Sequence, residues 1–184
     1  MNLTAALVVG HLIADFPLQT SWVYRFKTES WLGVVLHSAI HVIVTALLIH
    51  PLRSALPMLI VLGILHFITD FTKLRVPAKR QTPGFVIDQM AHLVVVMMLA
   101  QYWEGHITAS LPNALLFFLI GYGTFLGGMI FLWVLACDLA KSGLGSKPMV
   151  RWARTNLLTL SQYAGLSLVF FLAQLPLRYP KRPS

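Results

Sequence analysis

Six stretches of mostly apolar residues dominate this chain of 184 residues and limit what it can fold into. They cover residues 2–19, 31–50, 54–72, 84–103, 112–138 and 156–176. A helix needs about 20 such residues to cross the hydrocarbon core of a bilayer. Hydrophobic residues make up 57% of the chain and charged residues only 11%, which is outside the range of soluble domains. We therefore expect an all-α, polytopic membrane helix bundle with about six transmembrane helices.

The segments between these stretches are short and polar, and none has the composition or length of a linker between domains. We expect one integral membrane domain over residues 1–184. Within it, residues 1–103 would form a four-helix core, and residues 104–184 would add two further helices and a basic tail. The first apolar run follows no basic segment and contains no small-residue cleavage site, so it is interpreted as a retained helix rather than a signal peptide.

Lysine and arginine are distributed unequally between the two sides of the expected bundle. The first, third and fifth loops hold ten of them, and the other side holds four. The ten are Arg25, Lys27, Lys73, Arg75, Lys79, Arg80, Lys141, Lys147, Arg151 and Arg154, and the four are Arg53, Arg178, Lys181 and Arg182. The richer side should be cytoplasmic. This topology explains the net charge of +8, so no nucleic-acid partner is expected.

Several other features have a structural interpretation. Cys137 is the single cysteine and lies in an apolar run, so an intrachain disulfide is impossible. Gly123 and Gly127 form a GxxxG pattern that permits close helix packing. Residues 141–154 resemble an interfacial segment that contacts lipid headgroups. The polar residues expected at the opposite interface are His50, Glu104 and His106.

Each of the first four expected helices carries two histidine or aspartate residues at a spacing of four. The four pairs are His11 and Asp15, His37 and His41, His66 and Asp70, and Asp88 and His92. A spacing of four places both side chains on one face of a helix, one turn apart. The sequence therefore presents eight potential metal ligands on four helices.

The depth of these pairs supports one shared site. At about 1.5 Å per residue, all eight residues fall between about 3 and 15 Å from the cytoplasmic ends of their helices. They include three of the six acidic residues and five of the seven histidines in the chain. Because a charged side chain at the bilayer centre costs about 2.5 to 3.5 kcal/mol, such a concentration needs a common partner. A divalent cation would offset the desolvation of several groups together.

Imidazole and carboxylate ligands without thiolates suit Zn(II), Fe(II) or Mn(II), and one or two zinc ions are our first expectation. With one ion, the remaining His and Asp would surround the ligands or act as a general base. Hydrogen bonding across helices and proton relay are the alternatives to metal, and haem fits three carboxylates poorly. The catalytic candidates are Asp15, Asp70 and Asp88. Whichever of them does not bridge metal ions would be the general base. Gln19 and Gln89 would orient ligands or a substrate oxygen.

Four motifs carry a resemblance to a known family. The segments "HLIADFPLQTSW", "LHSAIH", "HFITDFTK" and "DQMAHL" resemble the pattern HLxxDFxxQ, LHxxxH, HxxxD and DQxxH of small bacterial and phage membrane proteins catalogued as a domain of unknown function, DUF3307. The resemblance covers about the first hundred residues and implies a bacterial inner-membrane location but no activity. A looser similarity in ligand style, without the HRxxTHS motif, links the chain to membrane-bound metal-dependent hydrolases and favours hydrolysis.

The leading hypothesis is a membrane-embedded metal-dependent hydrolase that activates water near the cytoplasmic face. Its partners would be membrane lipid and a lipid or small-molecule substrate of phosphoester type, and its oligomeric state is left open. Three alternatives remain. A metal-ion or proton transporter would place its site nearer the midplane and use broken helices. A di-iron redox enzyme usually has Glu ligands, which the first four spans lack. In an accessory membrane subunit, the metal would be structural.

Overall fold

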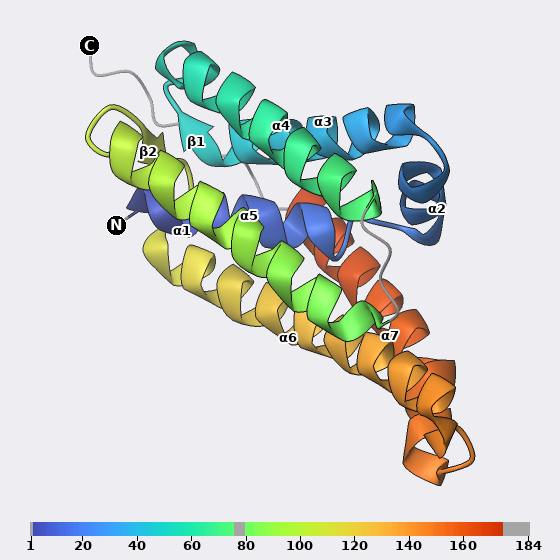
Figure 1. Ribbon diagram of the computed structural model, residues 1–184. Coiled ribbons are helices and arrows are strands. Elements are labelled where there is room, and N and C mark those ends of the chain that lie inside the picture. The colour runs from blue at the N-terminus through green and yellow to red at the C-terminus, as the bar shows by residue number, and fades with distance from the viewer. Residues whose placement is uncertain (1, 76–79, 175–184) are drawn as a thin grey trace.

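The computed structural model describes residues 2–75 and 80–174 and is an all-α membrane bundle, as predicted (Figure 1). Five helices are long and apolar enough to cross a membrane: α3, α4, α5, α6 with its π-helical extension η1, and α7. The helices are α1 (Asn2–Asp15), α2 (Ser21–Glu29), α3 (Trp31–Leu48), α4 (Leu52–Arg75), α5 (Gln81–Trp103), α6 (Asn113–Leu139), η1 (Ala140–Leu144) and α7 (Pro148–Ala173). Two short strands, β1 (Ile49–His50) and β2 (Thr108–Ala109), pair antiparallel.

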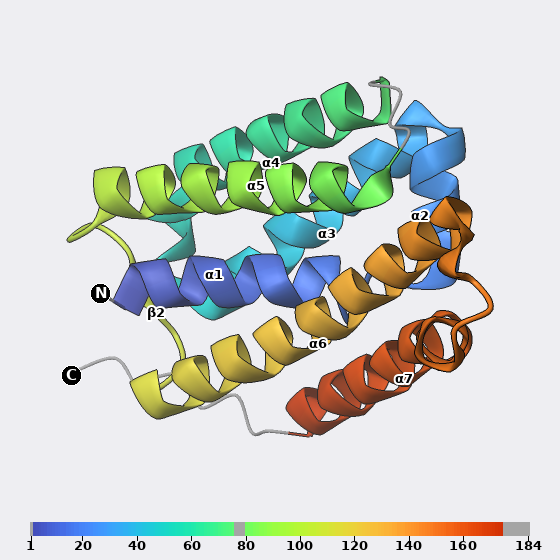
Figure 2. The same ribbon diagram turned by 60° about the horizontal axis from the view of Figure 1, so that its bottom comes forward.

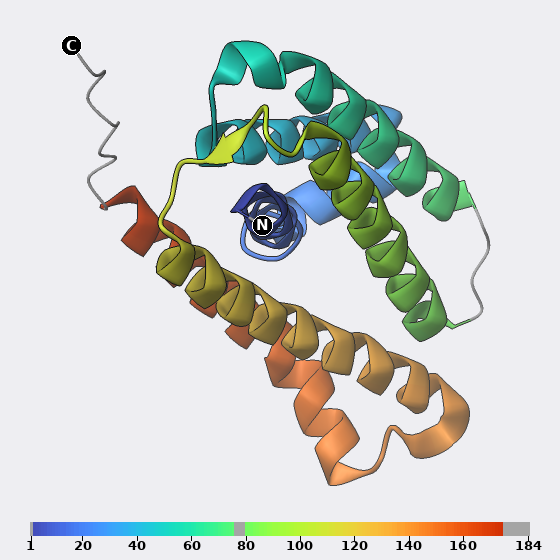
Figure 3. The same cartoon turned by 90° about the vertical axis from the view of Figure 1, so that its left-hand side faces the viewer.

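The predicted first span, residues 2–19, is too long. Helix α1 ends at Asp15 and has 14 residues, which is about 21 Å of helix and shorter than a typical span. The cause is Pro17, since the residue before a proline is disfavoured in the helical conformation. Although α1 is short, it is the central helix of the bundle: nine of its residues are buried, and Figure 3 shows it end-on with α3, α5 and α6 around it.

The predicted first loop is also wrong, because most of it forms helix α2. The Thr20 hydroxyl caps this helix by accepting a hydrogen bond from the Val23 amide. Val23 and Lys27, one turn apart, are its buried residues, so α2 is amphipathic. It packs on the start of α3, where a side chain at Gly33 would overlap the backbone of Phe26. The polar residues of this segment therefore form a helical cover over one end of the bundle.

The last two long helices pack beside the core (Figure 2). The GxxxG pattern has its predicted packing role: a Cβ atom added at Gly123 would lie 2.8 Å from Leu12, and one at Gly127 would lie 2.7 Å from Phe16. The first contact packs α6 against α1, and the second packs it against the residue that follows α1. Helix α7 begins at Pro148, earlier than the predicted residue 156, so the expected interfacial segment 141–154 is partly helical. The strand pair β1–β2 was not predicted.

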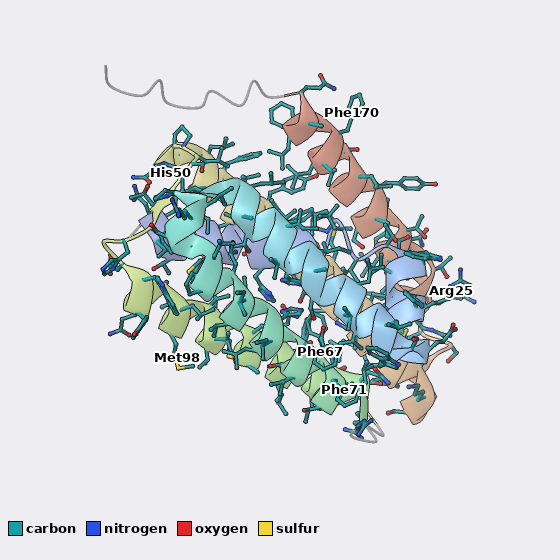
Figure 4. All side chains as sticks on the ribbon, turned by 90° about the horizontal axis from the view of Figure 1, so that it is seen from above. Arg25, His50, Phe67, Phe71, Met98 and Phe170 are labelled. Atoms are coloured by element: carbon teal, nitrogen blue, oxygen red, sulfur yellow. The ribbon has the colours of Figure 1, made fainter. Side chains whose placement is uncertain are left out.

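Basic residues gather at one end of the bundle, which we call the basic end. The end holds α2, the C-termini of α1, α4 and α6, and the N-termini of α3, α5 and α7. Figure 4 shows Arg25 at this end and His50 at the other. Among the described residues, Arg53 is the only lysine or arginine at the opposite end. The predicted basic tail with Arg178, Lys181 and Arg182, and the loop residue Lys79, lie outside the described residues.

Candidate metal centre

The eight predicted ligands form one buried cluster between α1, α3, α4 and α5. Each of the eight residues is at most 6% exposed. The ring centroids of His41 and His66 are 3.6 Å apart, and those of His66 and His92 are 4.1 Å apart. Helix geometry explains the convergence, because each helix presents one turn of its surface to the same depth. Within the cluster, six residues have ligand atoms close enough together to hold metal, and two do not.

The first potential ligand group contains Asp15, His37, His41 and His66. The ligand atoms that these residues offer all lie within 4.8 Å of one another. Asp15 Oδ1 accepts hydrogen bonds from His37 Nε2 at 3.1 Å and from His41 Nε2 at 3.0 Å. Ligand atoms around a tetrahedral zinc ion are separated by about 3.4 Å, as its bond lengths of about 2.0 to 2.2 Å require. A small adjustment would therefore bring this group to metal-binding geometry.

The second group contains His66, Asp70 and His92, so His66 belongs to both. His66 Nε2 lies 3.3 Å from Asp70 Oδ2, and His92 Nε2 lies 3.5 Å from Asp70 Oδ1. His37 Nε2 lies 3.7 Å from Asp70 Oδ2, which connects the two groups. The two oxygens of Asp70 thus face different histidines.

His11 and Asp88 lie at the edge of the cluster rather than in either group. The Gln89 side chain connects His11 to the first group: its Oε1 accepts from His11 Nε2 at 3.2 Å, and its Nε2 donates to Asp15 Oδ2 at 2.7 Å. Asp88 lies 3.5 Å from His92 Nε2 and forms an ion pair of 2.6 Å with Lys73. The sequence did not distinguish these two residues from the other six.

Gln19 lies one turn beyond Asp15 but does not contact its carboxylate. Its amide donates to the Asp15 backbone carbonyl at 3.4 Å. Its Oε1 accepts from Lys27 Nζ at 3.3 Å. Gln19 therefore holds a lysine beside the cluster, whereas Gln89 contacts the potential ligands directly.

Lys27 is the functional candidate that sequence reasoning missed. It was counted as one of the loop residues that set topology, but its side chain is buried and its Nζ lies 2.7 Å from Asp70 Oδ2. The available sequence signal was the spacing of Val23 and Lys27, which places both on one face of α2. Few lysines are fully buried unless they are paired, and Lys27 is paired with a carboxylate of the cluster.

Several buried polar atoms in the cluster have no hydrogen-bond partner among the described residues. They are His37 Nδ1, His66 Nε2, both oxygens of Asp70, Asp88 Oδ1 and His92 Nε2. Buried polar atoms are rarely left without hydrogen bonds, and each exception calls for an explanation such as an ion. Four of these six atoms belong to the second ligand group. Asp70 Oδ2 has Lys27 as an ion-pair partner at 2.7 Å, and the donor set and the other five atoms both fit a divalent cation.

The two sides of the cluster differ in polarity. Toward the basic end, the neighbouring side chains are Gln19, Lys27, Lys73, Asp88 and Gln89. Toward the opposite end, a cavity of about 10 Å³ lies against the histidines, and its other lining residues are Leu7, Thr45, Leu62, Val95 and Val96. This volume is close to that of a site for one water molecule. Beyond it lies the apolar core of the bundle.

A protein-family model described as "Protein of unknown function (DUF3307)" matches residues 3–118, more than half of the chain. The chain belongs to this family. No curated protein and no solved structure gives a significant match. The DUF3307 match includes all eight cluster residues and the whole of α2 through α5, and it ends inside α6. The candidate metal centre thus lies entirely within the family region, and α7 lies outside it.

Proposed function

We propose that this protein is a membrane-embedded, metal-dependent hydrolase of the bacterial inner membrane, with its site open to the cytoplasmic side. The observation that carries the proposal is the convergence of six buried imidazole and carboxylate ligands from four helices. Zinc is the preferred ion, and iron or manganese would fit the same donors.

The ligands divide naturally into two sets of three. Asp15, His37 and His41 would bind one ion, and His66, Asp70 and His92 would bind a second. His66 is given to the second set because Nε2 of a neutral imidazole binds one metal ion at a time. Each set has two histidines and one carboxylate, and catalytic zinc sites commonly use three protein ligands and leave one position open. Asp70 lies beside both sets, because His66 and His92 of its own set are 3.3 and 3.5 Å from its carboxylate and His37 of the other set is 3.7 Å from it.

A bound zinc ion would supply Lewis acidity and lower the pKa of a coordinated water to about 7. Asp88 is then the best general base, because it belongs to neither ligand set and lies at the polar side of the cluster. Its ion pair with Lys73 favours the ionised carboxylate that a base requires. Asp15 and Asp70 are assigned to metal binding. Gln89 would hold His11 and Asp15 in position through its two hydrogen bonds.

The asymmetry of the cluster favours an enzyme over a transporter. A transporter needs a polar route to both sides of the membrane. Here, Leu7, Leu62 and Val96 lie on the side away from the basic end, and the core beyond them is apolar. Among the described residues, charged and amide side chains lie beside the cluster toward the basic end, whereas Thr45 is the one polar side chain next to the histidines on the other side, as an active site entered from the cytoplasm would require. The remaining alternatives, a di-iron redox enzyme and an accessory subunit with a structural metal, are outcomes of the experiment below.

A groove on the membrane-facing side of the bundle supports a lipid substrate. It lies between α3 and α4, has a volume of about 500 Å³, and is lined by apolar side chains apart from Ser38. The Ser38 hydroxyl is occupied, because it donates to the Val34 carbonyl at 2.9 Å. Since both walls are membrane-spanning helices, a hydrocarbon chain is the occupant that this groove fits. Those two helices also carry His37, His41, His66 and Asp70.

The proposal is tested by metal analysis of purified protein and by hydrolysis assays on phospholipids, soluble phosphoesters and peptides. We expect up to two zinc ions per chain and hydrolysis of a phosphoester. His37→Ala should lower the metal content and abolish hydrolysis. His50→Ala is the matched control, because His50 is exposed at the opposite end. Iron with redox activity, metal without hydrolysis, or His37→Ala with unchanged metal content would each contradict the proposal.

A further inference from the structure

Lys27 brings a positive charge into the cluster from outside the four ligand-bearing helices. Its Nζ lies 2.7 Å from Asp70 Oδ2 and 3.3 Å from Gln19 Oε1, and the residue is 8% exposed. Lys73, which pairs with Asp88, is much less buried because its side chain is 37% exposed. Among the described residues, Lys27 is thus the buried ammonium group of this site.

The charges of the site indicate what must bind beside the metal ions. Three carboxylates and two ammonium groups give a net charge of −1 when the histidines are neutral. Two divalent cations would change this to +3, and a hydroxide would leave +2. An unbalanced charge of this size is costly in a buried membrane site. A substrate that brings two negative charges would restore balance, whereas a neutral ester or peptide would not.

Metal binding would also free Lys27 to contact that substrate. Once Asp70 coordinates the second ion, its charge is shared with that ion, and the ammonium group loses most of its counter-charge. A lysine ammonium is a well-established phosphate ligand and acts as a point charge. Because Lys27 Nζ is within 3 Å of a ligand of the second ion, it would reach a phosphate oxygen bound at that ion.

We propose that the substrate of this site carries a phosphate group, and that Lys27 binds an anionic oxygen of this phosphate when the metal ions are in place. This inference rests on the proposed function, since it presumes metal at the two ligand sets. Lys27 is therefore a substrate-binding residue whose pairing with Asp70 belongs to the metal-free state. The phosphate belongs to a lipid headgroup or to a soluble phosphomonoester, and both offer the same chemistry to Lys27.

The test measures phosphate binding by the full-length protein in nanodiscs, with and without Mn(II). Inorganic phosphate is the soluble probe, followed by the Mn(II)-induced broadening of its ³¹P resonance and by calorimetry. Phosphatidic acid in the nanodisc is the lipid probe. Three variants are compared with the natural chain: Lys27→Met, Lys27→Arg, and Arg25→Met as the matched control, since Arg25 is an exposed cation on the same helix.

We expect phosphate binding only in the metal-loaded protein. Lys27→Met should weaken it about 10- to 100-fold, the contribution of one charge-assisted hydrogen bond, while the bound metal stays at its natural stoichiometry. Lys27→Arg should retain binding, and Arg25→Met should not change it. Ala39→Phe fills the groove between α3 and α4. If the natural phosphate belongs to a lipid, this substitution should weaken binding of phosphatidic acid but not of inorganic phosphate. If it belongs to a soluble phosphomonoester, the substitution should change the binding of neither probe. Both of these results support phosphate recognition by Lys27.

The failure of this inference is distinguishable from failure of the proposed function. If the natural protein binds metal but no phosphate, or if Lys27→Met binds phosphate with unchanged affinity, the inference is overturned and the metal site stands. If the natural protein binds no metal, both are overturned. The comparison of metal-loaded and metal-free natural protein needs no variant, so absence of metal-dependent phosphate binding overturns the inference even if Lys27→Met does not fold.

Discussion

The ion pair between Lys27 and Asp70 allows a quantitative test of the metal-free site by a double-mutant cycle. Asp70 has no exposed surface, and its Oδ2 lies 2.7 Å from the ammonium of Lys27. Removal of one member of a buried ion pair leaves an uncompensated buried charge and typically costs about 3 to 5 kcal/mol. Replacement of both members by well-packed hydrophobic groups of similar volume is often nearly neutral, and replacement of both charges removes the uncompensated charge in the same way. The two substitutions should therefore be strongly non-additive.

The surroundings of each partner set the expected magnitudes. In Asp70→Asn, the Lys27 ammonium loses its counter-charge and keeps the amide oxygen of Gln19 as a polar partner. The free energy of unfolding should therefore fall by about 3 to 5 kcal/mol. In Lys27→Met, Asp70 keeps His66 and His92 within 3.3 and 3.5 Å, so the loss should be smaller, about 2 to 3 kcal/mol. The stability loss of the double variant should be smaller than the sum of the two single losses by at least about 2 kcal/mol.

Reversible unfolding in mixed detergent micelles, with a chelator present, would give these free energies. Arg25→Met should change stability by less than about 0.5 kcal/mol, since Arg25 is an exposed residue on the same helix. Additivity of the two substitutions within about 0.5 kcal/mol would refute the reasoning, because it would show that the two charges do not stabilise one another. With metal bound, the cost of Lys27→Met should shrink, because the cations then balance the charge of Asp70.

Three further substitutions test other parts of the structure. His66→Ala should lower the metal content from two ions to one by elemental analysis, since His66 completes the second ligand set, and two retained ions would exclude the proposed division. Gly127→Leu should lower the free energy of unfolding by about 1 to 3 kcal/mol through overlap with the Phe16 ring, whereas Gly128→Leu, with open space around it, should change it little in the same assay. Asp138→Ala should lower the thermal midpoint, with a loss of about 1 to 3 kcal/mol in the free energy of unfolding, because the Asp138 carboxylate accepts two hydrogen bonds of 2.8 Å from Thr82 at the start of α5. Lys141→Ala removes only an exposed partner of Asp138 and should leave the midpoint unchanged.

The membrane bundle and the eight-residue cluster were predictable because each depends on a simple sequence pattern. The length of each apolar run reflects bilayer thickness, and the spacing of four reflects one helical turn. Together they fix both the facing direction and the depth of a pair such as His66 and Asp70. The end of α1 could also have been predicted, because Pro17 lies two residues after Asp15, the last residue of the helix.

The division of the cluster was not predictable, because it depends on side-chain contacts between helices. Asp15 and Asp88 have the same predicted depth, about 6 Å from the cytoplasmic ends of their helices, yet Asp15 accepts hydrogen bonds from two histidines and Asp88 pairs with Lys73. Lys27 was missed for a different reason. A lysine on the cytoplasmic side is already explained by topology, so its sequence position alone did not indicate that α2 turns it inward toward Asp70.

The apolar side of the cluster and the charge balance of the site both favour joint binding of metal ions and an anion. Leu7, Leu62 and Val96 make the side away from the basic end largely apolar, and an apolar environment lowers the local dielectric and strengthens each interaction among the charged groups. In that environment, a metal-free cluster requires Lys27 to offset its carboxylates, and a metal-loaded cluster requires an anion instead. The lysine, the metal ions and a phosphate are thus linked: each would alter the affinity of the site for the others. A route for ions through the apolar side would break this linkage, because water in that route would screen the charges on which it depends.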